Sequence, residues 1–148
     1  MIQVRLLKWF LRVAGFLMFS ALVFVVAPRS WMRDIHVLVD LGPMPDAPIV
    51  WYLTRSTSAL YSMLGGLFWI LSFDITRHSG VLKYLGWATI AFGTVLCGVD
   101  VRAAMPVGWI ITEGPSVIFT GSVMLYLISH LEHAETKSRT TDNPTRGQ

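Results

Sequence analysis

Long runs of apolar residues, separated by short polar stretches, dominate the pattern along this chain. No run alternates apolar and polar positions for long enough to predict a membrane barrel, so the pattern favours helices. A transmembrane helix needs ~20 mostly apolar residues. Segments at about 9–27, 56–73, 81–99 and 107–131 meet this requirement. The pattern therefore predicts an all-α integral membrane protein, a four-helix bundle with one transmembrane domain over residues 1–131.

The connection at 28–54, between the first two predicted helices, is longer and more mixed in character than the other connections. Residues 30–41 can form an amphipathic helix. The stretch 42–48 is rich in glycine and proline, which prevents regular structure and turns the chain back toward the membrane. We expect an external amphipathic segment that lies in the membrane interface, with these side chains on its apolar face: Trp31, Ile35 and Leu38.

The first apolar segment has two interpretations. Basic residues precede it, and Val25-Val26-Ala27 resembles the cleavage site of a signal peptide. However, Pro28 follows immediately, and a proline after the scissile bond generally blocks cleavage. We therefore expect this segment to be retained as a transmembrane helix.

Basic residues are unevenly divided between the two sides of the predicted membrane domain, and this division predicts orientation. With a cytoplasmic N-terminus, the cytoplasmic side carries Arg5, Lys8, Arg12, Arg77, Lys83, Lys137, Arg139 and Arg146. The outer side carries the smaller set, Arg29, Arg33, Arg55 and Arg102. We predict a multi-pass protein of a bacterial inner membrane with both termini in the cytoplasm. Residues 132–148 are polar with mixed charge and are predicted to be a disordered cytoplasmic tail.

Composition agrees with the membrane interpretation. Of 148 residues, 53% are hydrophobic and 14% are charged, whereas a soluble domain usually carries about 25% charged residues. The net charge of +3 is small and follows from the topology, so the expected partner is the lipid bilayer and not nucleic acid. A single cysteine, Cys97, excludes an internal disulfide and a cysteine-based metal cluster.

Charged residues in or near the membrane core are the strongest pointers to function in such a chain. Arg55 precedes the second predicted helix, Asp100 ends the third, and Glu113 lies inside the fourth. Glu113 lies about 9 Å below the start of its helix, where an unpaired charge costs on the order of 3 kcal/mol or more. The sequence predicts a buried or half-buried polar network, or a ligand site, from Arg55, Asp100, Arg102 and Glu113. The alternative is that these ions only clamp the helix ends together.

Small residues recur on one face of three predicted helices. Small side chains let helices approach closely in lipid, so these faces are expected to point into the bundle. Asp100 follows Gly93 by seven residues and lies on the same face, which directs its charge inward too. The predicted packing residues are Ser58, Ser62, Gly66, Gly86, Gly93 and Gly121.

Glu113-Gly114-Pro115 is a local feature with two open interpretations. Pro115 removes a backbone donor and Gly114 loosens the chain, so the fourth helix could be kinked there beside a carboxylate. Alternatively, the helix begins at this point, and the acidic side chain suits the positive end of its dipole. The pattern alone does not separate the two.

No motif of catalysis or metal binding is present. His130 and His133 are three residues apart, but two ligands without a third do not make a metal site. The chain has no glycine-rich phosphate loop and no Gly-x-Ser-x-Gly elbow. The sequence predicts no catalytic residue, no metal site and no cofactor, and favours a protein that is not an enzyme.

Several short motifs occur between residues 51 and 131: Arg55-Ser56, Tyr61, Gly65-Gly66, Gly93, Asp100, Met105-Pro106 and Glu113-Gly114-Pro115. Their arrangement resembles small uncharacterised bacterial four-helix membrane proteins, broadly DoxX-like. The resemblance implies a four-helix bundle in a bacterial inner membrane. Some DoxX-like proteins are associated with redox or quinone-linked partners, whereas this chain has no redox cysteine pair.

Three functions remain compatible with the sequence. The first is an accessory or interaction protein that packs laterally with itself or with a membrane protein partner. The second is a binding site for a lipid- or quinone-type small molecule near the outer face, around Arg55, Asp100 and Glu113. The third is an oligomeric transporter or channel, since four helices alone rarely enclose a pathway.

Overall fold

The computed structural model describes residues 2–141, and these residues form helices without strands. The all-α prediction is therefore confirmed for this part of the chain. Apolar composition and helix-compatible spacing explain the long elements, while proline and glycine separate them. The helices are α1 (Ile2–Phe19), α2 (Leu22–Val26), α3 (Arg29–Leu38), α4 (Pro48–Leu71), α5 (Ser79–Arg102) and α6 (Val107–Thr141).

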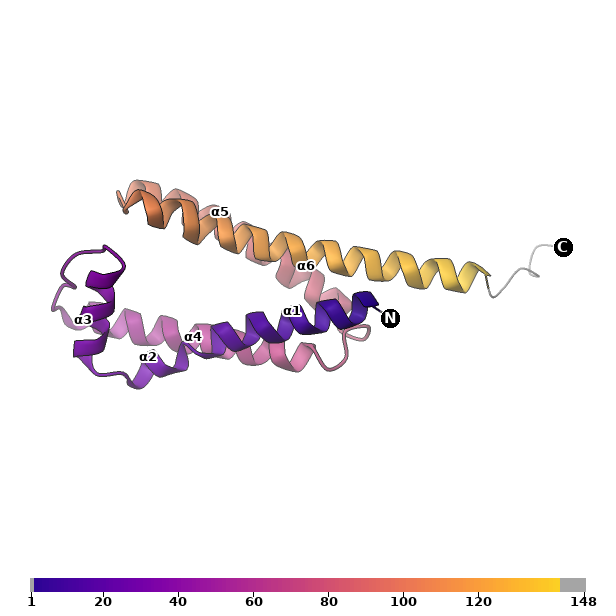
Figure 1. The fold of residues 1–148 in the computed structure, drawn as a ribbon, viewed down its shortest axis with the longest axis horizontal. Helices are drawn as coiled ribbons and strands as arrows, with labels where there is room; N and C mark the ends of the chain where they lie inside the picture. The colour runs from indigo at the N-terminus through magenta and orange to yellow at the C-terminus, as the bar shows by residue number, and fades with distance from the viewer. Residues whose placement is uncertain (1, 142–148) are drawn as a thin grey trace.

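The long helices form two antiparallel pairs. Helix α4 packs along α1 and α2, and α5 packs along α6. The two pairs lie close together near the N-terminus and diverge toward the opposite end, where α3 stands (Figure 1). Of the contacts between the pairs, that of α1 with α6 is the most extensive. The helices thus meet at one end and not along their whole length.

The main apolar core lies at the end where the pairs meet, which we call the closed end. It joins residues from α1, α4, α5 and α6 and from the turn after α4. Leu7, Leu11 and Leu82 are fully buried there. The full buried set is Leu7, Leu11, Phe68, Leu71, Ile75, Leu82, Met124, Leu127, Ile128 and Leu131. This cluster holds the two pairs together.

The opposite end, which we call the open end, holds α3, the last turn of α5 and the first turns of α6 (Figure 1). A second, separate apolar cluster lies here, but only on the α1–α4 side: Ala27, Met32 and Trp51. No buried apolar cluster joins the two pairs at this end within residues 2–141. The pairs therefore have a common core at the closed end alone.

Among the described residues, three helical stretches are long and apolar enough to cross a membrane: Gln3–Val26, Ser79–Arg102 and Val107–His133. Helix α4 is not among them. It includes Thr54 and Arg55 and three serines, Ser56, Ser58 and Ser62, so its mean hydropathy is lower. The structure thus provides three of the four predicted crossings by length and composition.

Several element boundaries differ from those predicted. Helix α4 begins at Pro48 and not near residue 56, because proline suits the first turn of a helix and residues 49–55 continue it. Helix α6 begins at Val107 and passes through Pro115, so the interpretation that placed the start of the helix at Glu113-Gly114-Pro115 is wrong. Helix α6 also continues to Thr141, past the predicted boundary at 131, and residues 142–148 lie outside the described part.

Helix α3 forms within the predicted external segment and packs on the start of α4. Its Met32 is buried against Trp51 and Ala27. The guanidinium groups of Arg29 and Arg33 lie 5.0 and 5.8 Å from the centroid of the Trp51 ring. The opposite face of α3 is exposed, with Trp31 56% and Leu38 83% accessible. One face of α3 thus packs on α4, and its apolar face with Trp31 and Leu38 is uncovered.

Candidate functional site

Asp100 is the least satisfied polar side chain at the open end. It lies in the last turn of α5, only 4% exposed, and its Oδ2 atom has no hydrogen-bond partner. Its backbone oxygen accepts a hydrogen bond from the Met105 amide, 3.1 Å away, in the turn between α5 and α6. Ala104 in this turn has a φ of 52°, a left-handed conformation that lets the chain reverse tightly. The carboxylate is thus held at a tight turn without a donor.

Glu113 has a partner inside its own helix. The indole nitrogen of Trp109, one turn earlier in α6, donates a hydrogen bond to its carboxylate. The side chain is half-buried. The carboxylate is also close enough to Tyr61 of α4 for an electrostatic interaction with it. The partner of this carboxylate is therefore a donor four residues earlier in its own helix, and not the basic side chain expected from the sequence.

Arg55 bonds to the backbone at the end of α2 and not to either carboxylate. Its Nη2 atom lies 3.5 Å from the Ala27 carbonyl oxygen, to which it donates at the C-terminal end of α2. A cation suits this negative end of a helix. Ser62, on the same face of α4, lies 3.5 Å from the Phe19 carbonyl oxygen. This face of α4 packs on α1 and α2, and Arg55 therefore lies against these helices.

The four predicted network residues are therefore not brought together. No ion pair joins any two of Arg55, Asp100, Arg102 and Glu113 within residues 2–141. Arg102 is exposed at the end of α5, where a basic side chain suits the helix dipole. The predicted network does not form because Arg55 bonds to the end of α2 and Glu113 to Trp109 of its own helix, while the Oδ2 atom of Asp100 has no partner. Periodicity predicted the faces of the helices, but not which neighbour each face meets.

The small residues of α4 form the contact with α1. Ser58 and Ser62 are buried there, and the Ser62 hydroxyl donates to the Ser58 carbonyl oxygen, 2.8 Å away. The glycine at the contact is Gly65 and not the predicted Gly66. A Cβ atom on Gly65 would lie 2.5 Å from the Gly15 oxygen, whereas one on Gly66 would meet nothing within 4 Å. The partner of Gly65 on α1 is Gly15, the one glycine of the first apolar segment.

The α5–α6 pair is built on glycines from both helices. Gly86 lies against Gly121, and Gly93 against Gly114. Each helix therefore contributes two glycines seven residues apart, and the two sets face each other in antiparallel register. Three of these glycines were predicted as packing residues from their spacing. The sequence predicts that Gly114 loosens the chain, and the structure places it in close contact with Cys97 and Gly93.

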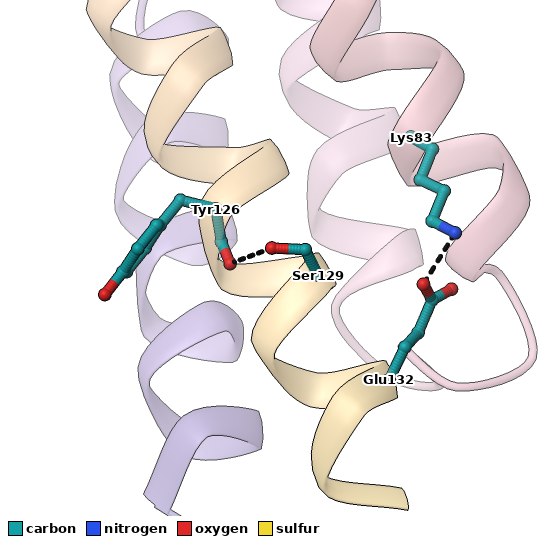
Figure 2. A network of polar contacts seen from close by, with 4 residues as sticks. All are labelled: Lys83, Tyr126, Ser129 and Glu132. Atoms are coloured by element: carbon teal, nitrogen blue, oxygen red, sulfur yellow. Dashed lines mark hydrogen bonds and ion pairs between the residues drawn. The ribbon is translucent and has the colours of Figure 1, made fainter. Parts of the chain in front are cut away.

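An ion pair and a side-chain-to-backbone hydrogen bond lie toward the closed end (Figure 2). The Lys83 ammonium of α5 lies 2.6 Å from the Glu132 carboxylate of α6, and both side chains are nearly half exposed. The Ser129 hydroxyl donates to the Tyr126 carbonyl oxygen within α6, 2.9 Å away. Tyr126 also contacts the ring of His130, with 4.2 Å between centroids. Of these contacts, the ion pair connects α5 to α6, and the other two lie within α6.

Replacing Lys83 by Gln is expected to lower the free energy of unfolding by less than about 1 kcal/mol, because exposed ion pairs contribute little. The measurement is the free energy of unfolding in mild detergent, titrated with a denaturing detergent, for the wild-type chain and the variant. Repeating it at high salt should reduce the difference further. A loss above about 2 kcal/mol, unchanged by salt, would contradict a solvent-exposed pair.

The histidines of the described residues do not lie in a cluster of metal-binding side chains. No group of three or more His, Cys, Asp or Glu side chains that could hold a metal ion occurs in the described part of the chain. His36 contacts the Gly42 carbonyl oxygen at 2.8 Å, and His78 contacts that of Asp74 at 2.7 Å. The first of these contacts stabilises the turn before α4, and the second stabilises the turn after it.

Comparisons with protein-family models, with curated proteins and with solved structures found no match to this chain. The DoxX-like resemblance of residues 51–131 therefore stays a prediction. The features of the structure that bear on function are a common core at one end, divergent pairs at the other, and a buried carboxylate oxygen without a donor.

Proposed function

We propose that this protein crosses its membrane four times, with α4 as the fourth crossing. The support comes from packing: α4 runs antiparallel along α1 and α2, which belong to a stretch that is apolar enough to span. Its polar serines are buried against these helices, Ser58 at 9% and Ser62 at 4% exposure. Exposed Ser56 donates to the Tyr52 carbonyl oxygen of its own helix, 2.8 Å away. A helix that satisfies its polar groups in this way is compatible with lipid.

The proposed location is a bacterial inner membrane with both termini in the cytoplasm, as the basic residues favour. In this orientation the closed end faces the cytoplasm and the open end lies at the outer surface. The exposed face of α3 would then lie in the outer interface, with Trp31 at headgroup depth.

The proposed function is that of an accessory or interaction protein that associates laterally with another membrane protein or with a second copy of itself. One observation carries this proposal: the two helix pairs share a core only at the closed end and diverge at the other (Figure 1). In this proposal a further transmembrane helix packs against the two pairs where they diverge. Association in lipid depends on close packing and interhelical hydrogen bonds.

Asp100 suggests what a partner would supply, namely a hydrogen-bond donor. A buried carboxylate oxygen without a donor costs free energy, and a partner's donor would recover it if the last turn of α5 rearranged on association to admit that donor. Its position in the last turn of α5 is next to the open end. Arg55 and Glu113 already have partners, so they give no comparable support to a lipid or quinone site built from all three residues.

Replacing Asp100 by Leu, a side chain of similar size without polar atoms, is expected to change stability and association in opposite directions. The isolated protein should gain about 1–3 kcal/mol of unfolding free energy, because an unsatisfied buried group is removed. Association should weaken about fivefold or more, because interhelical hydrogen bonds in membranes contribute about 1 kcal/mol. The two measurements are unfolding in mild detergent and the subunit composition of complexes released from native membranes, by native mass spectrometry.

The matched control is Val99→Leu, one residue earlier on an exposed position of α5. It should leave both quantities unchanged. A wild-type protein that is monomeric in native membranes and in bilayer nanodiscs would overturn the proposed function. A discrete assembly that persists unchanged in Asp100→Leu would keep the association but remove Asp100 from it.

A further inference from the structure

An apolar groove lies on the outer surface of the α1–α4 pair. Its cavity volume is about 500 Å³. It opens where α1 ends and where Gly66 has no side chain to fill the space. Phe16 and Ile70 on its walls are 63% exposed, so the groove faces the surroundings of the helix pair and not its core. It is lined by Phe16, Phe19, Gly65, Gly66, Trp69 and Ile70.

A half-buried guanidinium group lies beside one end of this groove. The Cζ atom of Arg12 lies 5.8 Å from the centroid of the Trp69 ring and 5.5 Å from that of Phe73. Its Nε atom donates to the Ser72 hydroxyl, 3.3 Å away. No carboxylate in the described part of the chain forms an ion pair with Arg12. Trp69 belongs both to the groove wall and to the arginine contact, so the two features adjoin.

We propose that this groove binds an anionic phospholipid, with an acyl chain along the apolar walls and the headgroup phosphate against the Arg12 guanidinium. The proposal rests on the membrane location of α1 and is independent of the proposed lateral association.

The geometry suits a phospholipid along its length. From Arg12 to Phe19, α1 advances about 10 Å at 1.5 Å per residue. The groove therefore extends from the level of the guanidinium toward the interior of the bilayer, in the direction that an acyl chain takes from its headgroup. Trp69 lies between the polar and apolar parts, a position in which its ring contacts both.

The charge selects an anionic headgroup. The Nη atoms of an arginine can bind phosphate oxygens in a bidentate manner, and the Nε bond to Ser72 and the two aromatic rings hold the guanidinium in place. Lys8 lies one turn before Arg12, is half-buried, and adds a second positive charge on that side of α1. A zwitterionic lipid carries its own cation, which competes with these two groups for the phosphate. A neutral apolar molecule, or a helix of a second copy, would fill the groove without needing Arg12.

The test uses the full chain in neutral detergent, supplied with equal amounts of phosphatidylglycerol and phosphatidylcholine, with bound lipids counted by native mass spectrometry. The wild-type protein should retain phosphatidylglycerol about tenfold more than phosphatidylcholine. Arg12→Gln should lose this preference, and Gly66→Leu should lose both lipids, because its side chain enters the groove. The control Arg5→Gln, an exposed residue of the same helix, should behave as wild type. Inorganic phosphate should not compete, because it lacks the acyl chain.

A second measurement does not depend on any substitution at Arg12. Phosphatidylglycerol with brominated acyl chains should quench tryptophan fluorescence more than brominated phosphatidylcholine does, and the excess should vanish in Trp69→Phe. Equal retention of both lipids by the wild type, or an unchanged preference in folded Arg12→Gln, would overturn the proposal. So would full lipid retention in Gly66→Leu, since the chain would then lie elsewhere.

Discussion

Gly65→Leu is expected to separate α1 from α4 and to destabilise the protein by at least about 3 kcal/mol, the upper part of the usual range for overpacking. A Cβ atom at this position would lie 2.5 Å from the Gly15 oxygen and 2.5 Å from the Phe19 nitrogen. Both are backbone atoms, which cannot relieve the clash by changing rotamer as a side chain can. The helices would have to move apart along their length, and the buried contacts of Ser58 and Ser62 would be lost with them.

Gly66→Leu is the matched control for this prediction. It introduces the same side chain one residue later, where a Cβ atom meets nothing within 4 Å. Replacing a helical glycine also removes its entropic penalty, so this variant should be as stable as wild type or slightly more stable. The measurement is the free energy of unfolding in mild detergent, together with a disulfide cross-link between cysteines placed on α1 and α4. Equal stability of the two variants would show that Gly65 is not the contact residue.

The choice between Gly65 and Gly66 shows what the sequence could and could not predict. Both glycines are visible in the second apolar segment, and small residues in lipid predict a helix contact. Adjacent residues on a helix differ by about 100° in direction, so the choice depends on where the partner helix lies. That direction is set by α1 and α2 on one side and by the divergence from α5 and α6 on the other. Neither is encoded in the local pattern of α4.

The α5–α6 pair could be predicted better because its signals lie close together in the sequence. Its connecting turn is short, so the two helices had to be antiparallel neighbours, and glycines recur every seven residues on α5. The candidate network of charges failed for the opposite reason. It required Arg55 from one pair to meet Asp100 and Glu113 of the other, and nothing in the periodicity fixes the distance between pairs. The bond from Trp109 to Glu113 was within reach of sequence reasoning, since the two residues lie four apart in one helix.

Gly93→Leu is expected to open the α5–α6 pair at its middle. A Cβ atom there would lie 2.8 Å from Ile118 Cγ1, 2.9 Å from the Gly114 oxygen and 2.9 Å from the Ile118 nitrogen. Two of these three are backbone atoms, so relief again requires the helices to separate. We expect a loss of about 3 kcal/mol, and the contact of Gly86 with Gly121 should weaken together with it because both lie on one straight interface.

Gly98→Leu, five residues further along α5, is the control, because a Cβ atom at Gly98 meets nothing within 4 Å. The two variants add the same side chain to the same helix and so to the same lipid surroundings. Their difference therefore measures the cost of the close approach alone. Hydrogen exchange of the α5 and α6 amides should locate the change: faster exchange in both helices for Gly93→Leu and none for Gly98→Leu. Exchange confined to α5 in the Gly93 variant would mean that α6 does not depend on this contact, and the pair would then be held by the closed-end core and not by its glycines.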